Sequence, residues 1–279
     1  MPEGHTLHRL ARDLGAAFGG QQVTSTSPQG RFALGAALVD GRVLHGAEAY
    51  GKHLFVSFDG VAQVVHVHLG LYGSFIFGDG EAPAPAGALR WRLATRAKYA
   101  DLRGATACDV LDPPEADRLR SRLGPDPLRT DAEPERAWSR IRGSRAPLAT
   151  LLMDQSVLAG VGNVYRAEVL FRHRVDPFMQ GRFLKRAQWY AMWADLVALM
   201  AEGFVTGRID TVQPEHEPEA MGRPPREDAH GGEVYVYRRS AQPCFVCGTL
   251  VRTREHAGRN LFWCARCQLR SRRRTPQNG

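Results

Sequence analysis

Apolar side chains recur every three or four positions in the first eighteen residues, and a pair of glycines follows at positions 19 and 20. This spacing puts the apolar side chains on one face of an α-helix, and glycine is common just past a helix end. The pattern therefore predicts an amphipathic helix that begins near Gly4 and packs against a core. Its apolar face consists of Leu7, Leu10, Ala11, Leu14 and Phe18.

From about Val23 to Val110 the pattern changes to short apolar runs separated by glycine and proline. Two of these runs are "RVLHGAEAYGKHLFVSF" and "AQVVHVHLGLYGSFIF". Short alternating runs with frequent turn residues are typical of antiparallel strands. We expect a β-sandwich or flattened barrel with the first helix packed on it.

The second half of the chain begins at "LGPDPLR" (residues 123–129), whose two prolines indicate a domain junction. Helical spacing dominates residues 134–207, where "RAPLATLLMDQSVLAG" (145–160) predicts an amphipathic helix ended by Gly160, and another helix follows "VGN". Residues 210–231 are rich in proline, glutamate and histidine and predict a mobile loop. The fold class is α+β, with three predicted domains at residues 1–122, 123–231 and 232–279.

The positive charge is concentrated at the C-terminal end. Residues 232–279 contain ten arginines and two glutamates, a net charge of +8, which equals the excess of the whole chain. This concentration favours a polyanionic partner, either nucleic acid or an acidic membrane surface, over a merely solvated tail. The longest apolar-rich segment, "WYAMWADLVALM", contains Asp195 and is too short to span a bilayer. With no signal peptide visible, we expect a cytoplasmic protein that does not enter a membrane.

Four of the five cysteines have the spacing C-x2-C-x16-C-x2-C. Two such pairs on hairpin turns can place four thiolates tetrahedrally around one zinc ion. We therefore predict one structural Zn²⁺ held by Cys244, Cys247, Cys264 and Cys267. Cys108 remains and is expected to pack as a small apolar residue.

Two polar residues are placed to bind an anion. Lys52 follows a glycine turn and precedes an apolar strand. Asn163 stands where "AGVGN" opens a helix, whose free N–H groups attract phosphate. The alternatives are a solvated lysine and an asparagine that serves as a helix N-cap.

Three histidine and turn features allow more than one interpretation. His66 and His68 share one strand face and could bind a metal, although no acidic partner is nearby. His216 and His230 in the predicted loop offer another pair. Leu71 and Tyr72 lie in a glycine-flanked turn, where they form either an exposed wedge that inserts between stacked bases or part of the core.

Taken in order along the chain, six motifs resemble the formamidopyrimidine-DNA glycosylase and endonuclease VIII family of base-excision repair enzymes. The resemblance extends nearly from end to end. Leu-Tyr in the wedge turn and His-Thr-Leu after the opening are closest to the endonuclease VIII branch, in particular its actinobacterial form. The motifs are "MPEGHTL", "GKHLF", "HLGLYG", "LGPDPL", "LLMDQSVLAGVGNVYRAEVLFRHRVDP" and "GRNLFWCARCQ".

The resemblance implies a catalytic role for the first residues of the chain. Removal of Met1 would free the amine of Pro2, which attacks C1′ of the damaged nucleotide and forms a Schiff base. Glu3 would serve as the acid and base. The first helix is expected to begin directly after these two residues.

The resemblance also implies the DNA contacts. Phosphates would be gripped by Lys52, by Asn163 in a helix–two-turns–helix motif and by Arg259 in a β-hairpin zinc finger. Leu71 and Tyr72 would fill the space left by the extruded base. In the purine-specific branch a further loop supplies an arginine to the opposite strand. Here "YADLRG" offers Arg103 for that part.

The resemblance therefore implies a monomeric DNA glycosylase with apurinic/apyrimidinic lyase activity. Its substrates would be oxidised bases, in the first place pyrimidines, in double-stranded DNA, with strand cleavage by β,δ-elimination. Three alternatives stay open: the same chemistry on oxidised purines, a lyase that uses Lys52, and a non-catalytic zinc-stabilised protein that binds damaged DNA.

Overall fold

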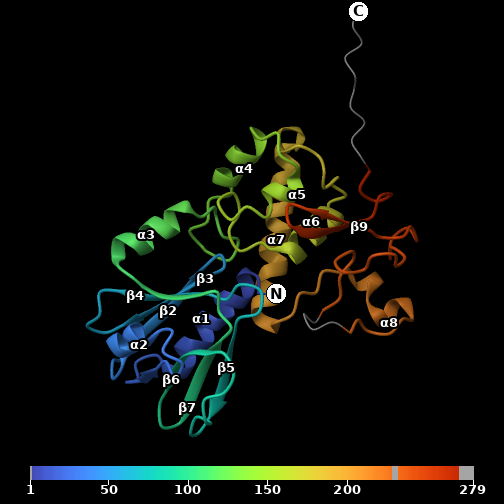
Figure 1. The fold of residues 1–279 in the computed structure, drawn as a ribbon. Helices are drawn as coiled ribbons and strands as arrows, with labels where there is room; N and C mark the ends of the chain where they lie inside the picture. Colours follow the sequence, from blue (N-terminus) through green and yellow to red (C-terminus); the bar gives the residue numbers. More distant parts are fainter. Residues whose placement is uncertain (1, 228–231, 270–279) are drawn as a thin grey trace, which may run out of the picture. The chain divides into compact units, whose positions relative to one another are not determined.

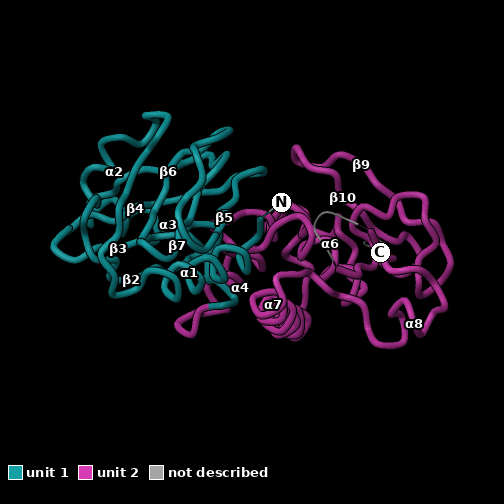
Figure 2. Tube along the Cα trace, turned by 90° about the horizontal axis from the view of Figure 1, so that it is seen from below, with its two compact units in different colours: residues 1–128 teal, residues 129–279 magenta. Residues whose placement is uncertain are grey.

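The computed structural model describes residues 2–227 and 232–269, and Figure 1 labels most of its helices and strands. The chain divides into two compact units, residues 1–128 and 129–279 (Figure 2). The first carries the predicted sandwich, and the second carries the helices and the cysteines.

Unit 1 contains two four-stranded antiparallel sheets with strand orders β1-β6-β7-β5 and β2-β3-β4-β8. Buried side chains of both sheets belong to one apolar core, as predicted for a sandwich. The elements are α1 (Gly4–Phe18), β1 (Thr24–Thr26), α2 (Ala33–Val39), β2 (Leu44–Tyr50), β3 (His53–Phe58), β4 (Val64–His68), β5 (Ser74–Asp79), β6 (Leu89–Ala94), β7 (Lys98–Arg103), β8 (Ala107–Leu111) and α3 (Pro113–Arg122).

The predicted first helix is confirmed as α1, which begins at Gly4 and ends at Phe18. All five residues of its predicted apolar face are buried in the core of unit 1. Cys108 also lies in this core, and burial raises the pKa of its thiol, as expected for a packing residue. The α1 helix contacts β2 and β3, the strands that flank the Lys52 turn.

The prediction of strands alone over residues 23–110 is wrong at α2. The segment "ALGAALV" forms a seven-residue helix after Phe32, whose ring is buried and packs edge-to-face on Trp91 with centroids 5.6 Å apart. Alanine and leucine favour a helix, but seven residues are too few to show a clear helical period.

In its described residues, unit 2 is mainly helical and contains the β9–β10 hairpin. In α7 a buried face includes Trp189, Met192 and Leu196, and Gly207 ends the helix with a φ of 76°. The elements are α4 (Pro134–Arg142), α5 (Leu148–Leu151), α6 (Asn163–Arg172), η1 (Gly181–Phe183), α7 (Arg186–Thr206), η2 (Pro214–His216), α8 (Pro218–Met221), β9 (Arg252–His256) and β10 (Arg259–Trp263).

The predicted helix over residues 145–160 is wrong in length. Only the four residues of α5 are helical, and turns occupy 152–160. The Asp154 side chain accepts a hydrogen bond from the N–H of Ser156 at 2.9 Å, and the Gln155 amide donates to the carbonyl of Val161 at 2.9 Å. Such local side-chain bonds compete with helix formation, and they give the segment its two turns before α6.

Residues 210–227 are not wholly irregular, because η2 and α8 lie within them. His216 Nδ1 and the Tyr235 hydroxyl are hydrogen-bonded at 3.0 Å, whereas His230 lies outside the described residues.

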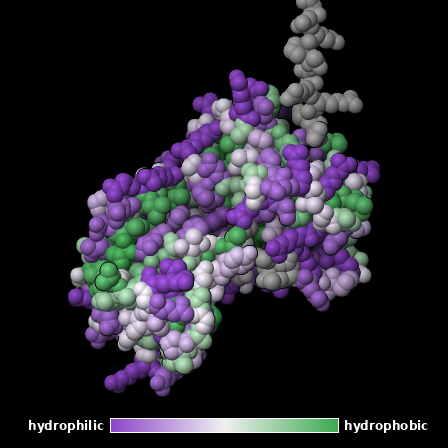
Figure 3. Space-filling view, viewed as in Figure 1, coloured by the Kyte–Doolittle hydropathy of each residue, from purple (hydrophilic) through white to green (hydrophobic). Residues whose placement is uncertain are grey.

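Hydrophilic side chains cover much of the face in Figure 3, with hydrophobic patches between them. In the described part of the chain, no helix has the length and apolar character needed to cross a membrane.

Candidate functional site

Pro2 and Glu3 lie at the N-terminal end of α1. Glu3 has an extended backbone, and its side chain is 0 % exposed, whereas Pro2 is half-buried. The Glu3 carbonyl accepts the N–H of Thr6 at 2.9 Å, the first bond of the helix. Burial, followed by the positive charge of Arg9, lowers the pKa of His5 to about 4, so this ring is neutral near pH 7. The protein thus holds a buried carboxyl group beside the residue predicted as the nucleophile.

Lys52 lies in the two-residue turn between β2 and β3, as predicted, and is half-buried. The N–H of Gly51, the other turn residue, donates to the buried Asp126 carboxylate at 2.7 Å. The same carboxylate oxygen accepts a bond from His8 of α1 at 2.7 Å. The sequence motif "LGPDPL" contained this carboxylate, but its prolines indicated only a junction.

Three histidines gather on one face of β3 and β4. His53 Nδ1 and His66 Nε2 share a hydrogen bond at 2.9 Å, and the His53 and His68 ring centroids are 5.0 Å apart. Burial is the main cause that lowers the pKa of His53 to about 3 and that of His66 to about 4. The N–H of Gly70 donates to His68 Nδ1 at 3.1 Å, so that nitrogen acts as an acceptor. The rings form a neutral polar layer beside Lys52, and nothing in their arrangement supports the metal alternative.

The turn between β4 and β5 exposes both of its large side chains. Tyr72 is 88 % exposed and Leu71 is 39 % exposed, so the core interpretation of this turn is wrong. Gly70 has a φ of +70°, and a Cβ there would lie 1.9 Å from Thr106 Oγ1. At Gly73 a Cβ would lie 2.3 Å from the Leu69 carbonyl oxygen. The two glycines are therefore required for a tight turn that presents an aromatic side chain to solvent.

Arg103 ends β7 and is bound within unit 1. Its Nη2 donates to the buried Asp101 at 2.9 Å, and its Nη1 donates to the Ala86 carbonyl at 2.8 Å. Asp101 also receives two bonds from Arg92, at 2.6 and 2.8 Å. The contact between Arg103 and DNA stays a prediction, and the side chain would have to make it in addition to these bonds.

In unit 2, α6 begins at Asn163, but Gly162 is the N-cap, so the N-cap alternative for Asn163 is wrong. The Asn163 amide instead donates to the Asn260 carbonyl at 3.0 Å and accepts a bond from the buried Arg166. Asn260 follows Arg259 in β10. The structure therefore places the two predicted phosphate-binding residues of unit 2 near each other. Arg166 bonds to the Asn163 side chain and to the Asn260 carbonyl, and no pattern in the sequence marks it as their link.

The four cysteines come together as predicted for a zinc site. Their sulfur atoms all lie within 4.8 Å of one another, with Cys244 to Cys267 at 3.9 Å and Cys247 to Cys264 at 3.5 Å. Tetrahedral Zn–S bonds require sulfur separations of about 3.8 Å. Within residues 2–227 and 232–269, these cysteines form the only group of three or more ligating side chains placed to hold a metal. The donor set suits one structural zinc ion.

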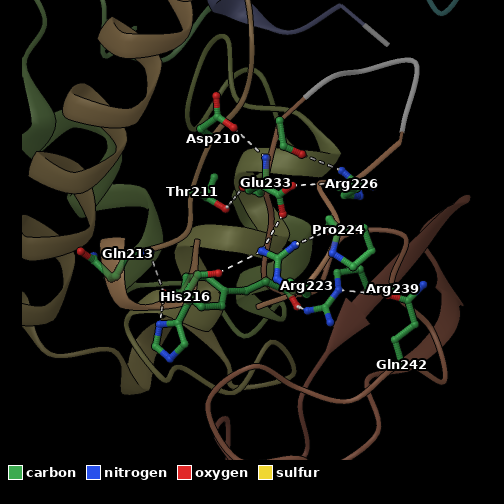
Figure 4. A network of polar contacts seen from close by, with 12 residues as sticks. Asp210, Thr211, Gln213, His216, Arg223, Pro224, Arg226, Glu233, Arg239 and Gln242 are labelled. Atoms are coloured by element: carbon green, nitrogen blue, oxygen red, sulfur yellow. Dashed lines mark hydrogen bonds and ion pairs between the residues drawn. The ribbon is translucent and has the colours of Figure 1, made fainter. Parts of the chain in front are cut away.

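A network of polar contacts joins residues 210–227 to the segment that leads into the cysteines (Figure 4). Glu233 accepts the N–H of Arg226 at 2.6 Å and forms an ion pair with Arg223 at 2.7 Å. The guanidinium groups of Arg223 and Arg239 lie 4.2 and 3.4 Å from the centroid of the Phe245 ring. These contacts attach η2 and α8 to the zinc-binding segment.

Three family models match the chain. The formamidopyrimidine-DNA glycosylase N-terminal domain matches residues 1–108, and the formamidopyrimidine-DNA glycosylase H2TH domain matches residues 123–213. The zinc finger found in FPG and IleRS matches residues 241–270, which include all four cysteines. Together the matches cover most of both units.

Individual relatives agree with these models. "Endonuclease 8 1" of Mycobacterium tuberculosis is 52 % identical over 275 residues, covering 96 % of this chain and 100 % of the relative. "Probable endonuclease 8 2" of Streptomyces coelicolor is 33 % identical, with coverage of 96 % and 94 %. The solved MutM (Fpg) protein of Thermus thermophilus matches with a TM-score of 0.72 and 27 % identity, covering 96 % of this chain and 98 % of that one. The chain belongs to the formamidopyrimidine-DNA glycosylase and endonuclease VIII family, the DNA glycosylase-lyases of base excision repair.

Proposed function

We propose that the protein excises oxidised bases from double-stranded DNA through a Schiff base on the Pro2 amine and then cleaves the strand by β,δ-elimination. The observation that carries this proposal is the fully buried carboxyl group of Glu3 beside Pro2, at the start of α1. The endonuclease 8 names of two relatives support oxidised pyrimidines as the preferred class, with oxidised purines as the alternative. We place the enzyme in the bacterial cytoplasm, associated with the nucleoid when it acts, as a monomer.

The chemistry follows from a secondary amine next to a carboxyl group. After Met1 is removed, an α-amine with an ordinary pKa near 8 is neutral in about a tenth of the molecules at pH 7. Its nitrogen attacks C1′, the N-glycosidic bond breaks, and the base leaves with a proton. Glu3 protonates the ring oxygen as the sugar opens, which leaves an iminium ion between Pro2 and C1′.

The iminium ion accepts electrons in the two eliminations that cut the strand. Loss of a C2′ proton breaks the bond between C3′ and its phosphate oxygen, and a second elimination breaks the bond at C5′. Water then hydrolyses the Schiff base and restores the Pro2 amine. Glu3 would carry protons in these steps, since it is the buried carboxyl group next to the nucleophile.

The remaining predicted residues would bind DNA. Lys52 and Arg259 supply cations for phosphates, and the N-terminal end of α6 at Asn163 presents free N–H groups to another. Leu71 and Tyr72 would enter the base stack, which offsets part of the few kcal/mol that base extrusion costs. Arg103 would contact the opposite strand. The zinc ion would stabilise the β9–β10 hairpin, which carries Arg259. Its four thiolate ligands leave no open position for catalysis.

Borohydride trapping tests the proposal. Protein without Met1, verified by intact mass, should become covalently linked to a duplex with one oxidised pyrimidine when borohydride is present. A matched variant with a glutamine inserted between Met1 and Pro2 should retain its methionine, bind the duplex and give no adduct. If both proteins bind DNA and neither is trapped, the non-catalytic alternative is correct. If Lys52→Ala abolishes trapping and the insertion does not, Lys52 is the nucleophile.

A further inference from the structure

Asp126 is a buried carboxylate at the end of unit 1 that no step of the proposed chemistry uses. Its side chain is 0 % exposed. Its Oδ2 accepts bonds from His8 Nε2 and from the Gly51 N–H, both at 2.7 Å, and its Oδ1 accepts the Leu128 N–H at 2.9 Å. A buried carboxylate is costly unless such partners compensate it, so all three groups are held firmly.

The partners of Asp126 come from the two elements that carry the proposed chemistry. His8 lies on α1, five residues after Glu3, and Gly51 directly precedes Lys52. Tyr50, at the end of β2, makes a second connection to the Asp126 segment, because its hydroxyl donates to the Gly124 carbonyl at 3.1 Å. One carboxylate oxygen therefore joins the Pro2-Glu3 helix to the Lys52 turn.

We propose that Asp126 is a positioning residue, which acts through His8 and Gly51 to fix Pro2 and Glu3 relative to Lys52. This inference rests on the proposed function. Lys52 would hold the phosphate beside the lesion, and Pro2 must reach C1′ of the same nucleotide. The distance between amine and sugar carbon thus depends on how α1 is set against the Lys52 turn. A shift of 1 Å in such a geometry costs about 100-fold in rate.

The test compares the chemical step with DNA binding in Asp126→Asn. Asparagine keeps the size but offers an NH₂ group where Asp126 has an accepting oxygen, so it cannot accept the bonds of His8, Gly51 and Leu128 together. On a duplex with a preformed abasic site and protein in excess, the rate of borohydride-trapped adduct formation should fall about 10- to 100-fold. The dissociation constant measured without borohydride should change by less than about threefold, since the phosphate contacts remain. His8→Gln, which leaves the two backbone bonds, should show a smaller loss of the same kind.

The chain contains a matched control pair. His45 and Asp59 are hydrogen-bonded at 3.0 Å in the same unit, but their side chains are 73 % and 57 % exposed. His45→Gln and Asp59→Asn remove the same kind of bond at the surface and should leave the trapping rate unchanged. Thermal unfolding of all four variants shows whether the native fold is retained at the assay temperature.

A double-mutant cycle separates positioning from general destabilisation. In a Lys52→Ala background, Asp126→Asn should lower the trapping rate by a smaller factor than in the wild type. The reason is that Asp126 and Lys52 both act on the distance between the Pro2 amine and C1′. Equal factors in the two backgrounds, or a wild-type rate in folded Asp126→Asn, would overturn the inference. If Asp126→Asn does not fold, a wild-type rate in His8→Gln overturns it. Failure of the wild-type protein to form any adduct would instead overturn the proposed function.

Discussion

At the scale of single residues, Glu3 is one of the fully buried carboxylate side chains of the protein, together with Asp101, Asp126 and Glu168. Glutamate is rarely fully buried, yet Glu3 is 0 % exposed at the start of a helix. We predict that Glu3→Gln lowers base excision at least about 100-fold, because the amide cannot donate a proton to the opening sugar. Single-turnover excision on a lesion duplex measures this effect.

The control for Glu3→Gln is Glu81→Gln, which changes an exposed carboxyl group in a loop of the same unit. This variant should excise the base at the wild-type rate. Both variants should bind the lesion duplex with the wild-type affinity. Normal excision by Glu3→Gln would remove Glu3 from the mechanism.

Tyr72 gives a second prediction at this scale. Because the side chain is 88 % exposed, Tyr72→Ala should leave the melting temperature unchanged. Loss of a stacking contact worth about 1–3 kcal/mol should slow excision by about 5- to 150-fold. Leu34→Ala, at an apolar residue of α2 that is 90 % exposed, is the matched control and should have no effect on either measurement. A large fall in melting temperature for Tyr72→Ala would show that the ring packs in the fold.

Residue type and spacing identify these residues in the sequence, but their partners come from distant parts of the chain. The glycine-flanked turn of Tyr72 is a local feature that allowed either an exposed or a buried ring, and the structure shows the exposed one. The inward orientation of Asn163 depends on Asn260, 97 positions later, and the role of Asp126 depends on His8, 118 positions earlier. Local patterns contain no information about such pairs.

At the scale of elements, the turn between β4 and β5 depends on its glycines. Gly70 and Gly80 have similar φ angles, +70° and +76°, but a Cβ at Gly80 meets nothing within 4 Å, whereas one at Gly70 meets Thr106. Gly80→Ala should therefore cost about 1 kcal/mol of stability from the backbone alone. Gly70→Ala should cost at least about 1 kcal/mol more and slow excision as the turn shifts. Denaturant unfolding of both variants measures the difference in the free energy of unfolding. Equal losses would show that a Cβ at Gly70 does not clash with Thr106.

The β9–β10 hairpin lies between the two cysteine pairs, and we call it the zinc-binding hairpin. It gives the second prediction at the scale of elements. Removal of the metal with a strong chelator should unfold the hairpin and weaken DNA binding, because the binding energy of the ion is part of the folding energy. It should also release the bonds of Asn260 to Asn163 and of His256 to Thr150, which are 3.0 and 2.8 Å long. Circular dichroism and DNA binding before and after re-addition of zinc check this. Full affinity without metal would contradict a structural role.

The elements with a strong period were predictable, and those governed by local side-chain bonds were not. The α1 helix and the strands of the sandwich followed from spacing alone. The segment after α5 has helical spacing, but Asp154 and Gln155 bond to nearby backbone groups and turn the chain instead. The α2 helix was missed because seven residues give no clear period.

At the scale of the whole molecule, each unit contains part of the proposed machinery. Unit 1 holds Pro2, Glu3, Lys52 and the Tyr72 turn, while unit 2 holds Asn163, Arg259 and the cysteines. The division into three domains at residues 122 and 231 stays a prediction. Bonds such as that between Asn163 and Asn260 join the helices to the zinc-binding hairpin, which explains why both belong to one compact unit.

The central claim is that the nitrogen of Pro2 forms the bond to the sugar. The most direct measurement is peptide mapping by mass spectrometry of the borohydride-reduced adduct between the wild-type protein and lesion DNA. Our account predicts that the sugar remnant is attached to the N-terminal peptide, which begins with Pro2 and lacks Met1. A remnant on Lys52 or any other residue, or an adduct on protein that still carries Met1, would contradict it.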